Sequence, residues 1–258
     1  MSKGKILVGL GVALALFALA GPANAIRLRA GDILVIGDGG FSPKKLPKNR
    51  NAPIEIHGGG RIDTVSGKLP PILHKIIFRF DKHGHVETRG LMVCTRRKLE
   101  FTDVNRARKN CRGAIIGKGF GRAIVAFPDT RPFTAGTPIT LFNGPRKGGN
   151  PTLFAHAYLY EEGRLGPTTF IVPIEIKRVR QGRYGYLVET EIPEIAGGYG
   201  IPKAGSIRVE KRWTFKGKRL SYVNARCADG RLQAFGTFTF KDGTRLSGTF
   251  ARRCLVRR

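Results

Sequence analysis

Acidic residues are scarce in this chain of 258 residues, which contains 18 Asp and Glu against 46 Lys and Arg and has a formal charge of +28. Such a charge disfavours cationic partners and favours anionic ones, through a field that physiological salt screens over about 8 Å. The basic residues are spread along the chain rather than concentrated. The composition therefore leaves two interpretations open, an anion-binding surface and a basic surface that keeps the protein in solution.

Long apolar runs are also lacking, with one exception at residues 6–20, which follows two lysines. That run is shorter than the ~20 residues of a membrane span, and a Gly-Pro pair and small residues up to Ala25 come directly after it. This pattern is typical of a signal peptide cleaved after Ala25, the alternative being a retained N-terminal anchor. We expect a secreted or extracytoplasmic, envelope-associated protein of residues 26–258, without a transmembrane helix after cleavage.

Residue combinations that hold metals or cofactors are missing. The chain has no Cys-x-x-Cys, and the His-Gly-His sequence at 83–85 lies in a predicted turn beside Lys82, which disfavours a bound cation. The glycines at 117–121 lie inside a predicted strand, with no helix after them to receive a phosphate. The sequence therefore predicts no metal site and no cofactor.

A nucleophile motif is missing as well. Residues 57–60 (His-Gly-Gly-Gly) match part of the oxyanion hole of some lipases and esterases, but the chain has no Gly-x-Ser-x-Gly elbow. We therefore predict a glycine-rich turn there. The carboxylates are scattered, so no catalytic pair is identified and an enzyme is not favoured. The alternative function is a hydrolase of envelope polysaccharides or esters, with residues that the sequence does not identify.

What the chain does contain is an even set of four cysteines, Cys94, Cys111, Cys227 and Cys254, all in the exported part. An even number in an exported chain predicts disulfides. Three pairings are possible. We expect the sequential one, Cys94–Cys111 and Cys227–Cys254, because each pair then closes a local element.

Short segments rich in β-branched and aromatic residues dominate the chain and alternate with turn formers, among them 35 Gly and 15 Pro. This pattern predicts an all-β domain over 26–258, an antiparallel β-sandwich or barrel, with a possible subdivision near 128–138. The expected strands cover 53–57, 74–81, 114–127, 139–142, 153–160, 169–179, 184–192, 206–215, 220–227, 232–240 and 245–252.

Two segments depart from the strand pattern. Thr102 or Asp103 is a suitable N-cap for a short helix that ends at Asn110, which makes a helical excursion between Cys94 and Cys111. Residues 38–52 show no periodicity, and we expect an extended loop there.

The last hairpin can be predicted in its register. A three-residue loop at 241–243, with its glycine in the left-handed position of a bulged type I turn, places Phe238 opposite Leu246. A two-residue loop places Phe238 opposite Ser247, and the apolar match favours the first register. In the preceding hairpin, a turn at 217–218 is expected to pair Phe215 with Leu220.

Several segments resemble a known group. They are 41–47 leading into an Ala-Pro pair, the Leu-Pro-Pro before the strand that ends at Phe80-Asp81, and Cys111-Arg-Gly-Ala running into an Ile-Gly-Lys-Gly strand. In these features the chain is similar to exported, β-rich actinobacterial proteins. The resemblance implies export, β architecture and disulfides. It implies no activity and no catalytic residues.

Basic loops are the main candidates for binding. They contain Lys44, Lys45, Lys48 and Arg50 in one loop, and Lys177, Arg178, Arg180 and Arg183 around another. Loops at one end of the fold would form an anion-binding surface, whereas loops at opposite ends would not. Aromatic residues fall on predicted core faces, so nucleic acid is a possible partner that the sequence does not favour. We predict a non-enzymatic protein that binds anionic envelope polymers or an anionic lipid surface.

Overall fold

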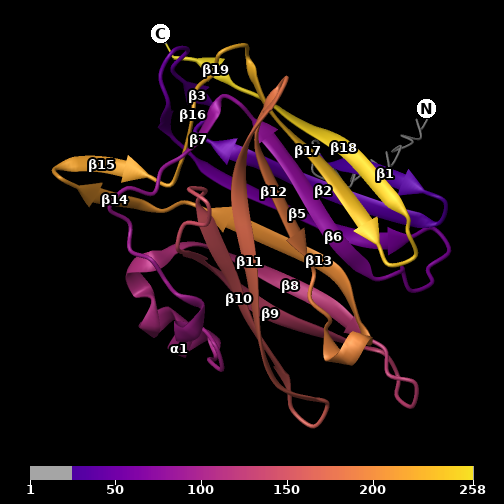
Figure 1. Cartoon of the computed structure of the whole chain (residues 1–258). Helices are drawn as coiled ribbons and strands as arrows, with labels where there is room; N and C mark the ends of the chain where they lie inside the picture. The colour runs from indigo at the N-terminus through magenta and orange to yellow at the C-terminus, as the bar shows by residue number, and fades with distance from the viewer. Residues whose placement is uncertain (1–24, 258) are drawn as a thin grey trace, which may run out of the picture.

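Strands dominate the computed structural model, which describes residues 25–257, so the predicted signal peptide lies outside the described residues except for Ala25. The main sheet has twelve strands, all paired antiparallel (Figure 1). In spatial order they are β1 (Ile26–Ala30), β2 (Ile33–Ser42), β5 (Glu55–Thr64), β13 (Gly200–Val209), β8 (Ile115–Val125), β9 (Phe133–Asn143), β10 (Thr152–Glu161), β11 (Leu165–Gln181), β12 (Tyr184–Glu191), β6 (Leu73–Asp81), β17 (Arg231–Phe240) and β18 (Arg245–Arg253).

The sheet curls into a nearly closed barrel, because its two edge strands meet. The side chains of Ile26 and Leu28 on β1 lie against Gly248 on β18, although the two strands share no backbone ladder. The predicted all-β, barrel-like fold is therefore confirmed. The turn-rich segment 128–138 contains part of the β8–β9 connection and the first residues of β9, and these two strands pair with each other.

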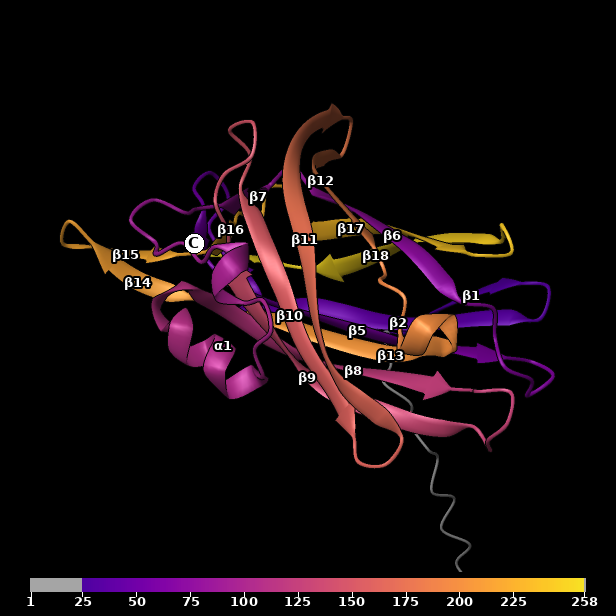
Figure 2. The same ribbon diagram turned by 60° about the horizontal axis from the view of Figure 1, so that its bottom comes forward.

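Small sheets and short helices surround the barrel. The remaining elements are β3 (Lys45–Leu46) with β19 (Leu255–Val256), β4 (Ala52–Pro53) and β7 (Gly84–Val86) on either side of β16 (Val223–Ala225), the hairpin β14 (Arg212–Phe215) and β15 (Lys218–Ser221), α1 (Val104–Asn110), and the 3-10 turns η1 (Arg96–Lys98), η2 (Arg112–Ala114) and η3 (Ala196–Gly198). Figure 2 shows α1 beside β9 and β10, which it contacts.

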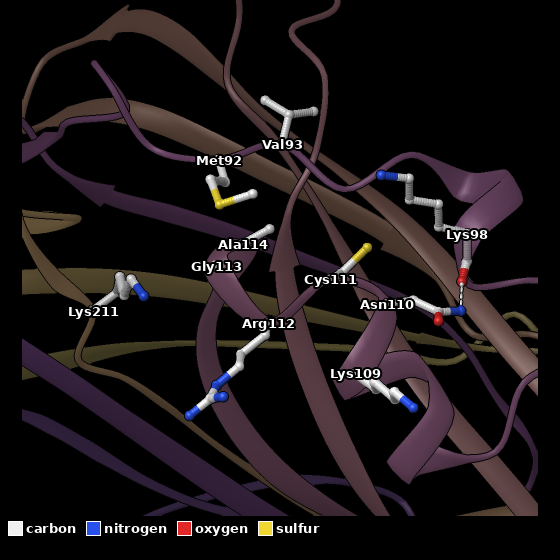
Figure 3. A pocket seen from close by; sticks show the side chains of 10 residues that line it. All are labelled: Met92, Val93, Lys98, Lys109, Asn110, Cys111, Arg112, Gly113, Ala114 and Lys211. Carbon is white, nitrogen blue, oxygen red and sulfur yellow. Dashed lines mark hydrogen bonds between the residues drawn. The ribbon is translucent and has the colours of Figure 1, made fainter.

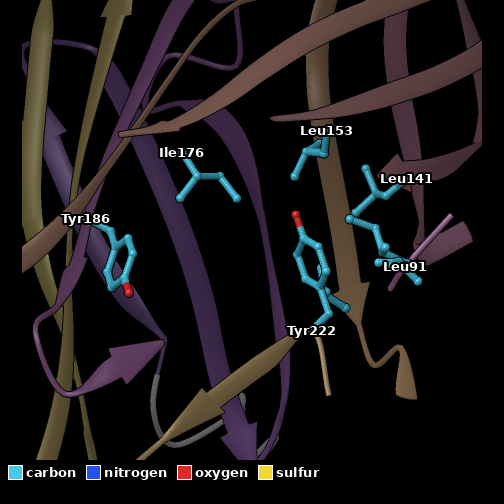
Figure 4. Packing of buried hydrophobic residues seen from close by; sticks show 8 residues of the cluster. Leu91, Leu141, Leu153, Ile176, Tyr186 and Tyr222 are labelled. Carbon is cyan, nitrogen blue, oxygen red and sulfur yellow. The ribbon is translucent and has the colours of Figure 1, made fainter. Parts of the chain in front are cut away.

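The barrel interior holds a core of aliphatic and tyrosine side chains, including Leu141, Leu153, Ile176, Tyr186 and Tyr222 (Figure 4). The first four come from the neighbouring strands β9, β10, β11 and β12, and Tyr222 lies between β15 and β16. Burial raises the pKa of the Tyr222 phenol, whose hydroxyl has no hydrogen-bond partner among the described residues. The interior is thus packed with side chains, and Tyr222 stays neutral within it.

The disulfides have the sequential pairing. Cys94 is bonded to Cys111 and Cys227 to Cys254, with Cα–Cα distances of 5.5 and 5.8 Å. The first spans the excursion that carries α1. The second joins the segment before β17 to the segment after β18. Disulfides are typical of proteins that work in an oxidising compartment outside the cytoplasm.

The final hairpin has the predicted register. Phe238 pairs with Leu246, and the N–H of Gly243 donates to the carbonyl of Phe240 at 3.1 Å. Gly243 has a φ of +86°, a conformation that side chains with a Cβ rarely adopt. The turn residues were sufficient to predict this register, because the apolar pattern of the two strands favours the same pairing as the turn.

The register predicted for the preceding hairpin is wrong by two residues. Phe215 pairs with Lys218 rather than with Leu220, and the turn residues Lys216 and Gly217 both have positive φ, 48° and 72°, as a type I′ turn requires. The indole N–H of Trp213 donates to the carbonyl of Arg89 at 2.9 Å. This contact with a distant segment accompanies the observed register and is invisible in the hairpin sequence.

The loop expected at 38–52 and the turn expected at 57–60 are also corrected. Strand β2 continues to Ser42, and 57–60 lies in the middle of β5, paired with β2 on one side and β13 on the other. A Cβ on Gly60 would lie 2.9 Å from the carbonyl oxygen of Ile36, so the backbones of β5 and β2 lie too close together there for a side chain. Glycine runs hide the alternation that marks a strand, which explains both errors.

Candidate functional site

The first predicted basic loop lies beside the Cys227–Cys254 disulfide. The N–H of Leu255 donates to the carbonyl of Lys44 at 2.8 Å, and the N–H of Cys227 donates to the carbonyl of Pro47 at 2.9 Å. Lys45, Lys48 and Arg50 are exposed, and their side chains make no hydrogen bond or ion pair with a described residue. Lys44 differs, since its ammonium lies 4.2 Å from the centre of the Phe41 ring.

The second predicted basic loop reaches the same end of the barrel. It is the β11–β12 turn, where the guanidinium of Arg183 is paired with Asp229, two residues after Cys227, and donates to the carbonyl of Arg231 at 2.6 Å. The segment 226–231 therefore contacts both loops. Of the two arrangements that the sequence left open, the structure has the one with both loops at one end.

Arg183 itself is a structural tie. Its Nε donates to the buried carboxylate of Asp81 at 2.7 Å, and Asp81 also accepts from the N–H of Gln233 at 3.0 Å. Burial alone would lower the pKa of Arg183, but hydrogen bonds and charge from Asp229 and Asp81 outweigh it and raise the pKa. This guanidinium already has two carboxylate partners and is not available to a ligand. Arg178 is also partly engaged, 5.4 Å from the Tyr186 ring.

A line of cross-strand partners, polar except for a glycine at one end, crosses the outer face of the barrel, and sequence reasoning missed it. The cross-strand partners are Gly40 with His57, His57 with Arg208, Arg208 with Lys118, and Lys118 with Thr140. We call these five residues the outer-face row. Since neighbouring strands lie about 4.8 Å apart, the row extends over about 19 Å.

Basic side chains from outside the barrel strands lie at both ends of the outer-face row. At one end, the positions of Lys44 Nζ and His57 Nε2 are 3.5 and 3.1 Å from where a Cβ on Gly40 would lie. At the other, Arg108 of α1 donates through Nε to the Thr140 hydroxyl at 3.0 Å. The row therefore connects the first predicted basic loop with the basic helical excursion.

The Lys44 end is crowded with positive charge. Arg252 donates to the carbonyl of Gly39 and to the Asp38 carboxylate, both at 2.6 Å. Partial burial, followed by the charge of Arg252, lowers the pKa of Lys44. Burial would raise the pKa of Asp38, but hydrogen bonds from Arg252 and Gly39 lower it. The Asp38 carboxylate therefore interacts with two cations, Arg252 and Lys44, and with the His57 ring.

The central cations of the outer-face row are exposed and loosely paired. The side chains of Lys118 and Arg208 are 69% and 49% exposed. Their carboxylate neighbours are distant, with Lys118–Glu210 at 3.9 Å and Arg208–Glu55 at 3.7 Å. Exposed pairs of this kind contribute little stability, so an incoming anion can replace them at small expense.

The helical excursion covers the outer face of β9 and β10. The Asp103 carboxylate caps α1 by accepting from the N–H groups of Asn105 and Arg106 at 2.7 and 2.9 Å. These hydrogen bonds lower the pKa of Asp103. Beneath the helix, a buried cluster holds the two cysteines with Leu99, Ala107, Ala114, Phe142 and Phe154. The predicted helix is confirmed, with Asp103 as its N-cap, and Ala107 is its buried residue.

A shallow pocket of about 580 Å³ opens where the excursion meets the connection between β13 and β14 at Lys211. Figure 3 shows basic side chains around an apolar centre of Met92, Ala114 and the Cys111 sulfur. The basic residues are Lys98, Lys109, Arg112 and Lys211. Their side chains make no hydrogen bond or ion pair with a described residue, and no acidic residue of the described chain lines the pocket. The pocket suits an anion with an apolar part.

The geometry assembles no group for hydrolysis at the histidines. His156 is fully buried, with Nε2 3.1 Å from both the hydroxyl and the carbonyl oxygen of Thr102, and burial lowers its pKa. Every carboxyl group of residues 25–257 whose pKa is displaced has a lowered pKa, whereas a general acid needs a raised one. The alternative hydrolase function gains no support from these groups.

The histidines at 83–85 do not lie together in a metal site either. His83 Nδ1 lies 3.0 Å from Asp81 Oδ1 in a buried turn, while burial lowers the pKa of His85. Among the described residues, no three His, Cys, Asp or Glu side chains are grouped as a metal ion would need.

Comparisons with known proteins name no relative. No protein-family model matches the chain, and no curated protein matches it. In the part of the chain that the structure describes, no helix is both long enough and apolar enough to span a membrane.

Proposed function

We propose that this protein is a non-enzymatic, extracytoplasmic binding protein that holds anionic polymers of the cell envelope on its outer-face row. Exposed Lys118 and Arg208 lie at the centre of the row, with Lys44 and Arg108 at its ends. The observation that carries the proposal is this alignment, because it joins basic segments far apart in the sequence into one line.

The alignment suits an extended polymer better than a compact anion. Cationic groups recur along a path of about 19 Å, with the strand spacing as the step. Each contact is exposed and screened by salt, so binding depends on several contacts made together. The two disulfides and the net positive charge agree with a protein that works outside the cytoplasm among anionic polymers.

Retention on immobilised polyphosphate, compared with a neutral polysaccharide, tests the proposal. The purified, oxidised protein is eluted with a salt gradient, and we expect stronger retention on the anionic polymer that falls steeply with salt. The double variant Lys118→Gln/Arg208→Gln should elute at clearly lower salt. The matched control is Arg131→Gln/Lys147→Gln, which removes the same charge from two hairpin loops where neither side chain has an ion pair.

Equal elution of the two double variants would show that overall charge, rather than the outer-face row, determines retention, and would overturn the proposal. Competition by soluble polyphosphate against duplex and single-stranded DNA separates the polymer classes. We expect polyphosphate to compete at least as well as either nucleic acid, since the row offers no stacked aromatic side chains.

A further inference from the structure

The two most exposed large apolar side chains of the described residues lie on the excursion, which we define here as residues 92–114. Phe101 is 94% exposed, Met92 65% and Val93 47%. Single exposed hydrophobic residues are normal on a protein surface, but a phenylalanine without any cover is not. The apolar exposure therefore indicates a surface that meets an apolar partner.

The backbone holds Phe101 outward. Its φ is +55°, in the left-handed region that bulky residues rarely occupy. Its neighbours Leu99 and Thr102 are buried, and the Thr102 hydroxyl donates to the carbonyl of Leu99 at 2.6 Å. Phe101 thus lies at the tip of a fixed turn whose inward positions are taken by other residues.

The excursion that carries these apolar side chains has an excess of positive charge, and Met92 and Val93 share a pocket lining with Lys98, Lys109 and Arg112. The excursion contains seven Lys and Arg and two acidic residues, a formal charge of +5. Both acids are occupied, since Glu100 pairs with Arg96 at 3.0 Å and Asp103 caps α1. Five cations have side chains without a hydrogen bond or ion pair to a described residue: Arg97, Lys98, Arg106, Lys109 and Arg112.

The excursion is rigid as well as basic. The Cys94–Cys111 disulfide closes it, and the Asn143 amide of β9 donates to the carbonyl of Met92 at 2.9 Å. The Asn110 side chain donates to the carbonyl of Lys98 at 2.9 Å, which ties its two arms together. Because these groups are already ordered, docking loses little conformational freedom.

We infer that the excursion docks the protein on an anionic lipid surface, with the Phe101 ring entering the headgroup–acyl boundary and the cations of the excursion contacting lipid phosphates. Exposed Phe beside Lys and Arg is the combination that binds such interfaces. A hydrophilic polymer satisfies the cations but gives the exposed phenylalanine no apolar environment. This lipid surface meets the outer-face row at Arg108, which donates to Thr140, but Phe101 is not part of the row or of the polymer site that we assign to it.

Sedimentation with vesicles tests the inference. The purified, oxidised protein should bind phosphatidylcholine vesicles that contain phosphatidylglycerol and should not bind vesicles of phosphatidylcholine alone. Phe101→Ser should weaken binding to the anionic vesicles by about tenfold, since it removes a large apolar side chain that would be buried in the bilayer on docking. The control Tyr160→Ser changes an aromatic side chain that is 52% exposed on β10 and should leave vesicle binding unchanged.

Two further variants test which residues contact the membrane and whether the side chain at position 101 enters it. Lys109→Gln/Arg112→Gln should weaken vesicle binding, and Phe101→Trp should show a blue shift of fluorescence on anionic vesicles, measured against the native Trp213 background. Retention of Phe101→Ser on polyphosphate should be unchanged, which separates failure of this inference from failure of the proposed function. Equal vesicle binding by the parent and Phe101→Ser, or a Phe101→Trp spectrum that vesicles do not change, would overturn the inference.

Discussion

At the scale of single residues, burial decides which side chains of this protein carry charge. His156 lies beneath the excursion with no carboxylate partner, so it is neutral in the fold. Arg183 is also largely enclosed, and it stays charged, as a guanidinium does in proteins; Asp81 and Asp229 balance its charge. The intrinsic pKa values of the two side chains already differ, and the surroundings increase the difference, since burial lowers the pKa of His156 and the carboxylates raise the pKa of Arg183.

The lowered pKa of His156 predicts a pH dependence of stability. Below about pH 6.5 the unfolded chain binds a proton that folded His156 does not, so the free energy of unfolding falls as pH falls towards the folded pKa. One such group contributes at most about 1.4 kcal/mol per pH unit. His85, whose pKa is also lowered by burial, acts in the same direction.

Urea unfolding at pH 7.5 and pH 5 measures this effect. His156→Gln should be less stable than the parent at pH 7.5 but should lose less stability on acidification. The control His57→Gln, at an exposed position, should retain the parent's pH dependence. If His156→Gln and the parent lost the same free energy between the two pH values, the pH dependence would have to come from other groups.

At the scale of elements, the excursion is an addition to the barrel whose structure depends on its own disulfide, Cys94–Cys111. Its contacts with the barrel are a small buried cluster and a few hydrogen bonds to β9 and β10. A seven-residue helix is too short to be stable by itself in water. The disulfide and the packed cluster are therefore what hold α1.

Removing the Cys94–Cys111 disulfide should destabilise the excursion more than the barrel. Cys94→Ala/Cys111→Ala is expected to lower the free energy of unfolding by roughly 3 kcal/mol, mainly because the unfolded chain gains freedom. Amide hydrogen exchange should rise over residues 95–110 and stay unchanged in the centre of β9 and β10. Uniformly faster exchange across the barrel would contradict this local role, and Cys227→Ala/Cys254→Ala provides a comparison at the opposite pair.

At the scale of the whole molecule, repulsion between like charges opposes the compact state. The chain after Ala25 has a formal charge of +26, that is +28 less the two lysines near the N-terminus. Carboxylates are too few to pair with most of the cations. One of those carboxylates, Asp81, is buried with its partner Arg183.

Salt should therefore stabilise the protein. As ionic strength rises from low to physiological values, the Debye length shortens from about 30 Å to about 8 Å, which weakens repulsion across the whole surface. We expect the midpoint of thermal unfolding to rise with sodium chloride and equally with other monovalent salts. A midpoint that falls with salt would mean that ion pairs, rather than repulsion, dominate the electrostatic stability.

The part of the fold that follows from local chemistry was predictable. Phe238 and Leu246 alternate with polar residues on either side of a Lys-Asp-Gly turn, and Asp103 precedes a helix that it caps. Such patterns act over a few residues, so the chain shows them directly. The strands of the β2–β5 region were not predicted, because their glycines carry no side chains and therefore show no alternation of polar and apolar residues.

By itself, the sequence determined the all-β class, the turn at Gly243, the capped helix and the excess of positive charge, since each depends on neighbouring residues or on composition. Only the tertiary structure decided that Lys44, His57, Arg208 and Lys118 form a line, that Arg183 is tied to Asp81, and that both basic loops share an end. Most of those contacts depend on strand order and register between segments far apart in the sequence, as between His57 and Arg208 or Asp81 and Arg183. No local pattern encodes that register, because it results from the packing of the whole barrel.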